Sequence, residues 1–122
     1  YGRITAIDMN TGEHLWWIPN GDTPDRIKNH PALQGVDIPV TGKTSKAITL
    51  VTRTLLMTAE GATGDPLLHA IDKQTGEHLG SVELPNPGQY GMMTYMHQGN
   101  QYVVVQIGGA GYPGSLAALR LP

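Results

Sequence analysis

The sequence repeats a ten-residue pattern. Residues 6–15, AIDMNTGEHL, match residues 70–79, AIDKQTGEHL, at eight of ten positions with a spacing of 64 residues. In both copies a short apolar run leads into polar turn residues that end in Gly, and a second run follows that ends close to a Pro. This arrangement predicts a strand, a tight turn and a second strand. Because repetition at a fixed spacing is typical of repeat architectures, we expect the two copies to occupy equivalent places in successive β-rich units.

Composition supports many short strands joined by turns. The 122 residues include 16 Gly and 9 Pro, with 39% hydrophobic and only 15% charged residues. The net charge is −2 and no basic run is present, which argues against nucleic acid as a partner. The absence of Cys excludes disulfides, thiolate nucleophiles and Cys-bound metals.

The strand pattern predicts an all-β fold. Residues 1–19 are expected to end one sheet, and residues 20–46 to form a long irregular loop with room for a helical turn or two at 22–29. Residues 47–85 hold four consecutive strand-like runs, enough for one complete antiparallel four-stranded blade. Residues 90–122 are expected to supply the strands of a closing blade. The prediction is a partial β-propeller of antiparallel four-stranded blades.

Three strands are expected in the closing blade. They are predicted at 92–96, 102–107 and 115–121. Gly99 and Asn100 are expected to form the first hairpin turn, and residues 108–111 the second.

Each copy of the repeat contains residues, at the same spacing, that can stabilise its turn. The first copy has Ala6, Asp8, Thr11, Gly12 and Trp16, and the second has Ala70, Asp72, Thr75 and Gly76, with Gly80 in place of the Trp. Asp can hydrogen-bond the backbone of its own turn, and Gly can take a positive φ there. The set resembles the tryptophan-docking motif of the quinoprotein dehydrogenases, propellers that hold pyrroloquinoline quinone (PQQ). The resemblance implies that Trp16 stacks on the adjacent blade, and that the second copy has lost this contact.

Further segments carry the same resemblance. Residues 93–95 (MTY), 99–105 (GNQYVVV), 108–109 (GG) and 117–122 (AALRLP) are similar to the C-terminal end of the glucose-dehydrogenase-like members. Residues 55–61 resemble a strand that opens a blade in that group. The resemblance, together with a first residue other than Met, leads us to expect a C-terminal piece of a longer protein.

The resemblance implies an oxidoreductase. Members of the family oxidise an alcohol or a sugar such as glucose by hydride transfer to PQQ, with a carboxylate base and a bound Ca²⁺. PQQ and Ca²⁺ are therefore expected in the parent enzyme, in the periplasm, with a respiratory electron acceptor. The catalytic base and the Ca²⁺ ligands are expected in earlier blades, so no catalytic residue and no metal ligand is assigned here. The segment alone is expected to be inactive and to bind neither PQQ nor Ca²⁺. The alternative is a non-catalytic PQQ-like repeat scaffold, as in outer-membrane assembly lipoproteins.

The long loop supplies weak candidates for cofactor binding, namely Asp22, Asp25 and Arg26, with Lys28 and His30 nearby. Loops on rigid scaffolds concentrate binding groups, but ordinary loop polarity is the preferred interpretation. His14 and His78 hold equivalent positions in the repeat, and no pair of His has the spacing of a helical metal site, so structural roles are expected. The expected partners are the remaining blades, a small alcohol or sugar, and a second copy of the segment through its exposed sheet faces.

Overall fold

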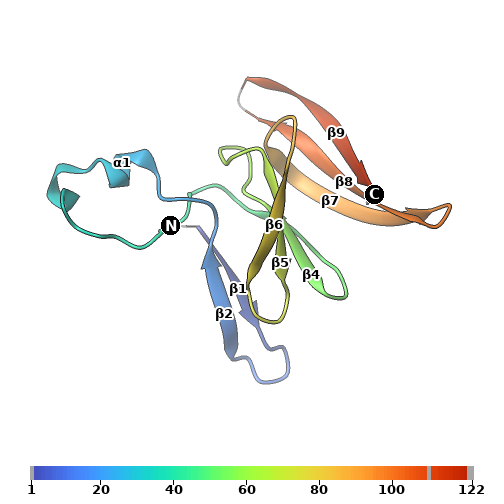
Figure 1. Cartoon of the computed structure of the whole chain (residues 1–122), viewed down its shortest axis with the longest axis horizontal. Coiled ribbons are helices and arrows are strands. Elements are labelled where there is room, and N and C mark those ends of the chain that lie inside the picture. Colours follow the sequence, from blue (N-terminus) through green and yellow to red (C-terminus); the bar gives the residue numbers. More distant parts are fainter. Residues whose placement is uncertain (1, 110, 121–122) are drawn as a thin grey trace.

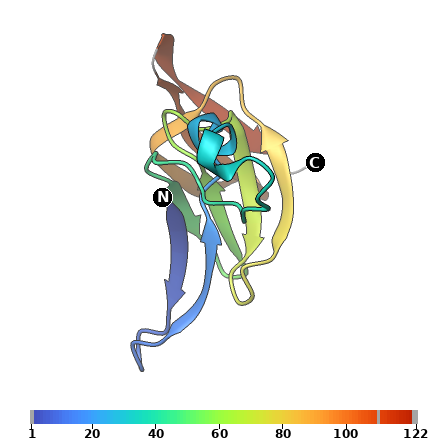
Figure 2. The ribbon, with the colours of Figure 1, turned by 90° about the vertical axis from the view of Figure 1, so that its left-hand side faces the viewer.

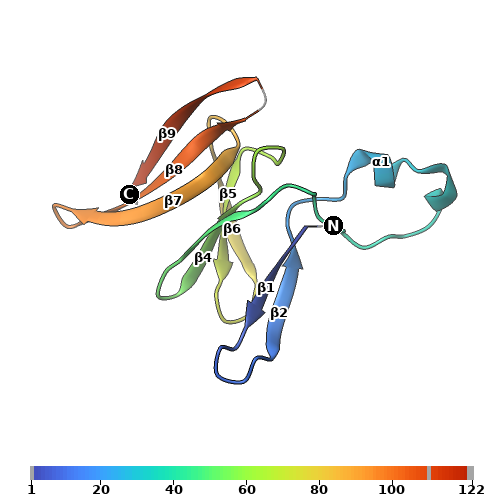
Figure 3. The same cartoon turned by 180° about the vertical axis from the view of Figure 1, so that it is seen from behind.

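The structure, a computed structural model, describes residues 2–109 and 111–120. Its strands form three antiparallel sheets in chain order. The first is a hairpin of β1 (Arg3–Ile7) and β2 (His14–Pro19), and the second contains β3 (Ile48–Val51), β4 (Leu55–Ala59), β5 (Leu67–Asp72) and β6 (His78–Glu83). The third contains β7 (Gly88–His97), β8 (Asn100–Gly109) and β9 (Tyr112–Arg120). Figures 1 and 3 show the sheets side by side.

The strand orders confirm the predicted fold class, a partial β-propeller. Each strand pairs with its neighbours in sequence, in the orders β1-β2, β3-β4-β5-β6 and β7-β8-β9. Such up-and-down sheets are the units from which propellers are built. No helix in the described part of the chain is long and apolar enough to cross a membrane.

The two copies of the repeat fold alike. The Asp8 carboxylate accepts hydrogen bonds from the amides of Asn10 and Thr11 at 2.7 and 3.2 Å, and the Asp72 carboxylate accepts from Gln74 and Thr75 at 2.7 and 3.0 Å. Each turn ends in a Gly with φ of 77°, and each hairpin has a register shift at the same place in the motif. The copies therefore form the same hairpin in two sheets.

The hydrophobic core lies between the second and third sheets. Its buried members are Ala59, Leu68, Leu84, Val103, Val105 and Ile107. Gly88 allows the sheets to approach closely, because a Cβ there would lie 2.7 Å from the Cβ of Ala59. The alternating burial of residues 103, 105 and 107 shows that one face of β8 is covered by the second sheet.

The long loop carries two helical turns. Helix α1 (Asp25–Lys28) lies within 22–29, as the sequence allowed, and a 3₁₀ turn, η1 (Pro31–Leu33), was not expected. Figure 2 shows this loop facing the viewer. It leaves the end of β2 and returns to the start of β3, at the same end of the sheets as the β4–β5 connection.

The strands of the third sheet are longer than predicted. β7 begins at Gly88 and not at residue 92, β8 extends to Gly109, and β9 begins at Tyr112. The reason at the start of β7 is that backbone pairing resumes on the far side of a bulge, between Gly88 and Ile107, although Gly has low β-propensity. Ala110, within the predicted second turn, and Leu121, at the predicted end of the last strand, lie outside the described residues.

The first hairpin turn of this sheet was predicted wrongly by one residue. The positive φ angles belong to Gln98 and Gly99, 48° and 78°, while Asn100 already pairs with His97. A two-residue hairpin turn with positive φ at both central residues matches the twist of the strands, and the pairing register places Gln98 there.

Candidate functional site at the loop end of the sheets

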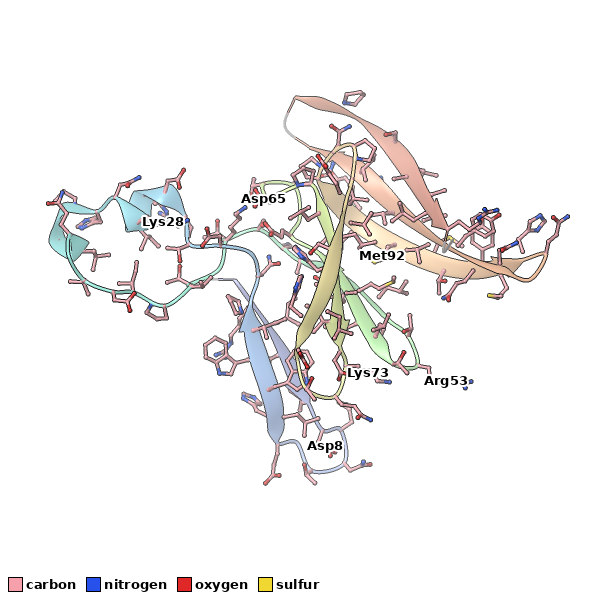
Figure 4. All side chains as sticks on the ribbon, in the orientation of Figure 1. Asp8, Lys28, Arg53, Asp65, Lys73 and Met92 are labelled. Atoms are coloured by element: carbon pink, nitrogen blue, oxygen red, sulfur yellow. The ribbon has the colours of Figure 1, made fainter. Side chains whose placement is uncertain are left out.

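Three connections meet at one end of the sheets. They are the long loop between β2 and β3, the β4–β5 connection, and the β6–β7 connection with the start of β7. Gly61 permits one close approach, since a Cβ there would lie 2.3 Å from the carbonyl oxygen of Lys46. Figure 4 shows Lys28 and Asp65 at this end, and Arg53, Lys73 and Asp8 toward the other. We call this region the loop end.

Glu60 is the central charge of the loop end. It follows β4 directly and is only 4% exposed. One carboxylate oxygen accepts hydrogen bonds from the Lys43 ammonium at 3.0 Å and from the Asp65 amide at 2.9 Å, and the other lies 3.4 Å from Nε2 of His69. Lys43 also pairs with the Asp65 carboxylate at 2.8 Å. Glu60 therefore ties the long loop to the β4–β5 connection.

The electrostatics of this cluster favour its charged form. Burial raises the pKa of Glu60, but hydrogen bonds from His69 and the Asp65 amide, together with Lys43, outweigh burial and lower the pKa from 4.5 to about 2. Burial lowers the pKa of Lys43, and the contacts with Asp65 and Glu60 outweigh it, so that this pKa is raised. Both partners are thus ionised at neutral pH, which is the condition under which a buried pair is stable.

Asn20 adds a neutral anchor beside this pair. Its buried amide donates to the carbonyl oxygens of Ser45 at 3.1 Å and Glu60 at 3.2 Å. Its backbone amide donates to the carbonyl of Gly2 at 3.0 Å, and its carbonyl accepts from the Lys43 amide at 2.7 Å. One side chain and its backbone thereby connect the first sheet, the long loop and the second sheet.

A first cleft lies between the long loop and the β4–β5 connection. Its volume is about 610 Å³, and its lining includes the predicted candidates Asp22, Asp25 and Arg26 together with Lys28 and Asp65. Asp22 pairs with Lys28, and the hydrogen bonds from Lys28 and from the Thr23 amide lower the Asp22 pKa. The three candidates thus share one cleft, and their role in cofactor binding stays a prediction.

His30 has a different environment from these candidates. Its Nδ1 accepts a hydrogen bond from the Ala32 amide at 3.2 Å and so caps the 3₁₀ turn.

A second cleft adjoins the first and shares Thr44 and Thr63 with it. It has a volume of about 720 Å³. Ala47, Ile48 and Ala62 supply apolar wall, and Lys46, Gln89 and Tyr90 supply polar or aromatic groups. This size is typical of small-molecule sites, which are mostly apolar with a few convergent polar groups.

The residues that build the loop end could not be predicted from the sequence. Lys43, Lys46 and Tyr90 belong to no local motif. Glu60 falls in the segment 55–61, but that resemblance gives it no partner, and Lys43 lies in another connection. One local signal was present, namely an acidic residue directly after the buried strand residues Thr58 and Ala59.

A third pocket of about 340 Å³ separates the first hairpin from the second sheet. Its walls include Ile4, Ile18 and Ile71. His69 and His78 also line it, and each lies within 2.9 Å of the Ser81 hydroxyl. His78 is therefore part of a polar cluster although its side chain is exposed. The equivalent His14 is also exposed, and Trp17 occupies the repeat position that corresponds to Ser81.

The turns of the motif lie at the end of the sheets opposite to the first and second clefts. The Trp16 indole donates to the carbonyl of Lys73 at 3.1 Å and covers Gly76, where a Cβ would lie 2.9 Å from the ring. Trp17 is 59% exposed, and a Cβ at Gly80 would meet nothing within 4 Å. This geometry is that of a contact between sheets; the assignment of all nine positions to a docking motif stays a prediction.

PQQ and Ca²⁺, the groups expected in the parent enzyme, require cations and oxygen ligands, respectively. PQQ carries several carboxylates, to which cations are complementary. Arg26, Lys28 and Lys43 line the first cleft, where Lys28 and Lys43 pair with carboxylates, and Lys46 lines the second cleft. Within residues 2–109 and 111–120, no group of three or more His, Cys, Asp or Glu is placed to hold a metal ion. That the segment alone binds neither PQQ nor Ca²⁺ stays a prediction.

Comparison with known proteins gives a consistent result. The family described as glucose/ethanol/alcohol dehydrogenase, β-propeller domain (PQQ), matches residues 1–103. A probable quinate dehydrogenase (quinone) of Xanthomonas campestris pv. juglandis is 37% identical over 90% of this chain and 14% of its own length. Quinoprotein glucose dehydrogenase A of Acinetobacter calcoaceticus is 33% identical over 100% of this chain and 15% of its own length.

A third relative is named for a different substrate. The glycerol dehydrogenase large subunit of Gluconobacter thailandicus is 38% identical over 89% of this chain and 14% of its own length. The chain thus spans about one seventh of the length of these relatives. These matches confirm the family predicted from the motifs, and the chain belongs to the PQQ β-propeller domain family of glucose, ethanol and alcohol dehydrogenases.

Proposed function

We propose that the chain is a propeller segment of a PQQ-dependent dehydrogenase that oxidises a hydroxyl group of an alcohol or a sugar. The observation that supports this most strongly is the match of nearly the whole chain to relatives that are all named as dehydrogenases. PQQ, when bound, supplies the acceptor for the hydride. The relatives' names give the candidate substrates as quinate, glucose and glycerol.

The residues of this segment have a shaping role in that proposal. Glu60, Lys43 and Asn20 fix the long loop against the β4–β5 connection, so that the two clefts keep their form. Precise placement of a bound alcohol is a large part of catalysis, because it converts the reaction into an intramolecular one. The base, the Ca²⁺ ligands and most contacts to PQQ belong, in this proposal, to the rest of the protein.

Localisation and electron transfer complete the proposal. We place the full-length enzyme in the periplasm, where it passes electrons to a respiratory acceptor. Cell fractionation with an antibody against this segment tests the compartment. Recovery of the protein from the cytoplasm alone would contradict it.

The test of the activity uses the full-length protein that contains this segment. PQQ and Ca²⁺ are added, and dye-linked oxidation of quinate, glucose and glycerol is measured, with a sample lacking PQQ as the control. We expect PQQ-dependent turnover of at least one substrate, and its loss on chelation of Ca²⁺. Protein that is folded but neither binds PQQ nor turns over any substrate would contradict the proposal and favour a non-catalytic scaffold.

A further inference from the structure

We propose that the second cleft binds the substrate, and that Tyr90 and Lys46 select a six-membered ring that carries both hydroxyl groups and a carboxylate. This inference rests on the proposed dehydrogenase function and narrows its substrate class. It concerns residues outside the repeat described above, and it follows from the backbone, exposure and charge of the cleft.

The backbone of Tyr90 is strained. Its φ is 69°, in the left-handed region that bulky residues avoid. It lies in a bulge of β7, where the register shifts between the pairs Gly88 with Ile107 and Met92 with Val105. Gly91 follows directly, so the residue best suited to a positive φ stands one position away from the strained one.

No hydrogen bond or ring contact of the Tyr90 side chain in the described part of the chain compensates for the strain in its backbone. The Tyr90 side chain is 79% exposed, and no ring contact or hydrogen bond holds it there. Gln98 provides the comparison, because its positive φ of 48° belongs to a two-residue hairpin turn that requires it. Strained residues concentrate at ligand-binding positions, where their orientation serves the ligand.

The charge of the cleft indicates the ligand. Lys46 is exposed, lines the cleft and has no ion-pair or hydrogen-bond partner for its ammonium in the described ranges, in contrast to Lys28 and Lys43. An unpaired ammonium in a cleft is complementary to a carboxylate. The Gln89 amide and the Thr44 hydroxyl, which line the same cleft, can both donate to and accept from alcohol groups.

These groups together define a substrate class. The face of an exposed tyrosine ring packs against the C–H face of a six-membered ring, the ammonium pairs with a carboxylate, and the amide and hydroxyl groups bind ring hydroxyls. An acyclic polyol lacks the flat face, and a neutral sugar lacks the carboxylate. The cleft therefore fits a cyclic hydroxy acid better than either.

The experiment compares binding with stability in the full-length protein. Affinity for quinate, glucose and glycerol is measured by calorimetry, and Tm is measured for each variant. We expect Tyr90→Gly to weaken quinate binding by about threefold to tenfold while raising Tm, because the ring is lost and the strain is relieved. Tyr90→Phe keeps the ring and is expected to leave quinate affinity within about twofold.

Matched control variants distinguish general effects of relieving backbone strain or removing a charge from effects that are specific to the second cleft. Gln98→Gly relieves the other positive φ and is expected to raise Tm without changing quinate affinity. Lys46→Gln is expected to weaken quinate binding about threefold to tenfold and to leave glucose binding unchanged. Arg53→Gln removes a cation at the opposite end of the second sheet and is expected to change neither.

The outcomes separate this inference from the proposed function. Unchanged quinate affinity in both Tyr90→Gly and Lys46→Gln, or no quinate binding by the wild type, overturns the inference even where PQQ-dependent turnover is present. Weakened PQQ binding with unchanged quinate binding also overturns it, since the cleft then belongs to the cofactor. Absent turnover with quinate binding that depends on both residues refutes the proposed function and supports the inferred site.

Discussion

The indole nitrogen of Trp16 donates a hydrogen bond to the backbone carbonyl of Lys73, 3.1 Å away, and so joins the first copy of the repeat to the turn of the second. The hairpin that carries Trp16 has no other strand neighbour in the described structure. It is held at one end by this contact and at the other by Asn20. Two polar anchors at opposite ends therefore fix the position of the first sheet.

Replacing Trp16 tests the first anchor. Trp16→Ala removes a half-buried ring and its hydrogen bond, and we expect a local loss of stability of about 2 kcal/mol. Hydrogen exchange of residues 3–19 and 72–79 in the full-length protein measures it, with faster exchange expected in both segments. Trp17→Ala, which truncates a neighbouring and more exposed ring, is the control and is expected to have little effect. Equal acceleration by both variants would contradict the role of Trp16.

Gly76 and Gly12 form a matched pair for a second prediction. Both have φ of 77°, so Ala at either position carries the same backbone strain of about 1 kcal/mol. Only at Gly76 would the new Cβ meet the Trp16 ring, at 2.9 Å, whereas at Gly12 it meets nothing within 4 Å. We expect Gly76→Ala to lower Tm more than Gly12→Ala, because the Trp16 ring must also move. An equal loss would contradict a steric contact of the Trp16 ring with residue 76 that affects stability.

The repeat predicted the hairpins because its information is local. Asp8 and Asp72 bind amides two and three residues away, so spacing alone is enough to place these turns. The loop end could not be predicted in this way. Lys43 and Glu60 are 17 residues apart and meet only because two connections leave the sheets at the same end. The φ of Tyr90 depends on the pairing register of β7 with β8, which its own sequence does not encode.

The pKa of Glu60 predicts an acid-sensitive step. Because the folded-state value is lowered from 4.5 to about 2, the unfolded state binds more protons, and stability rises with pH between these values. The contribution is nearly complete above about pH 5 and is lost as pH falls toward 2, by roughly 3 kcal/mol. Tm measured as a function of pH gives this slope.

Two variants assign that slope to Glu60. Glu60→Gln is expected to lower Tm at neutral pH, because Lys43 loses its partner, and to flatten the dependence between pH 4.5 and 2. Asp22→Asn removes an exposed carboxylate that pairs with Lys28 and is expected to leave most of the slope in place. An unchanged slope in Glu60→Gln would mean that another carboxylate carries the acid sensitivity.

The outer face of the third sheet predicts self-association of the isolated segment. The pairing register places Met93, Tyr95 and Leu116 on the face opposite to Val103 and Val105, and these three side chains are 55%, 41% and 70% exposed. Tyr95 stacks on Tyr102 with ring centroids 5.2 Å apart, which makes that face flatter. In a complete propeller another blade covers such a face, so in the isolated segment a second copy is expected to do so.

Sedimentation velocity over a range of concentrations measures this association. We expect the isolated wild-type segment to shift from monomer to dimer or larger species as concentration rises. Met93→Lys with Leu116→Lys places two cations on the face and is expected to keep the segment monomeric at the same concentrations, because each copy would repel the other. Val51→Lys with Val40→Lys, at exposed apolar positions outside this sheet, controls for added charge and is expected to leave association unchanged. A wild-type segment that stays monomeric, or one whose association the control pair abolishes equally, would refute an interface on this face.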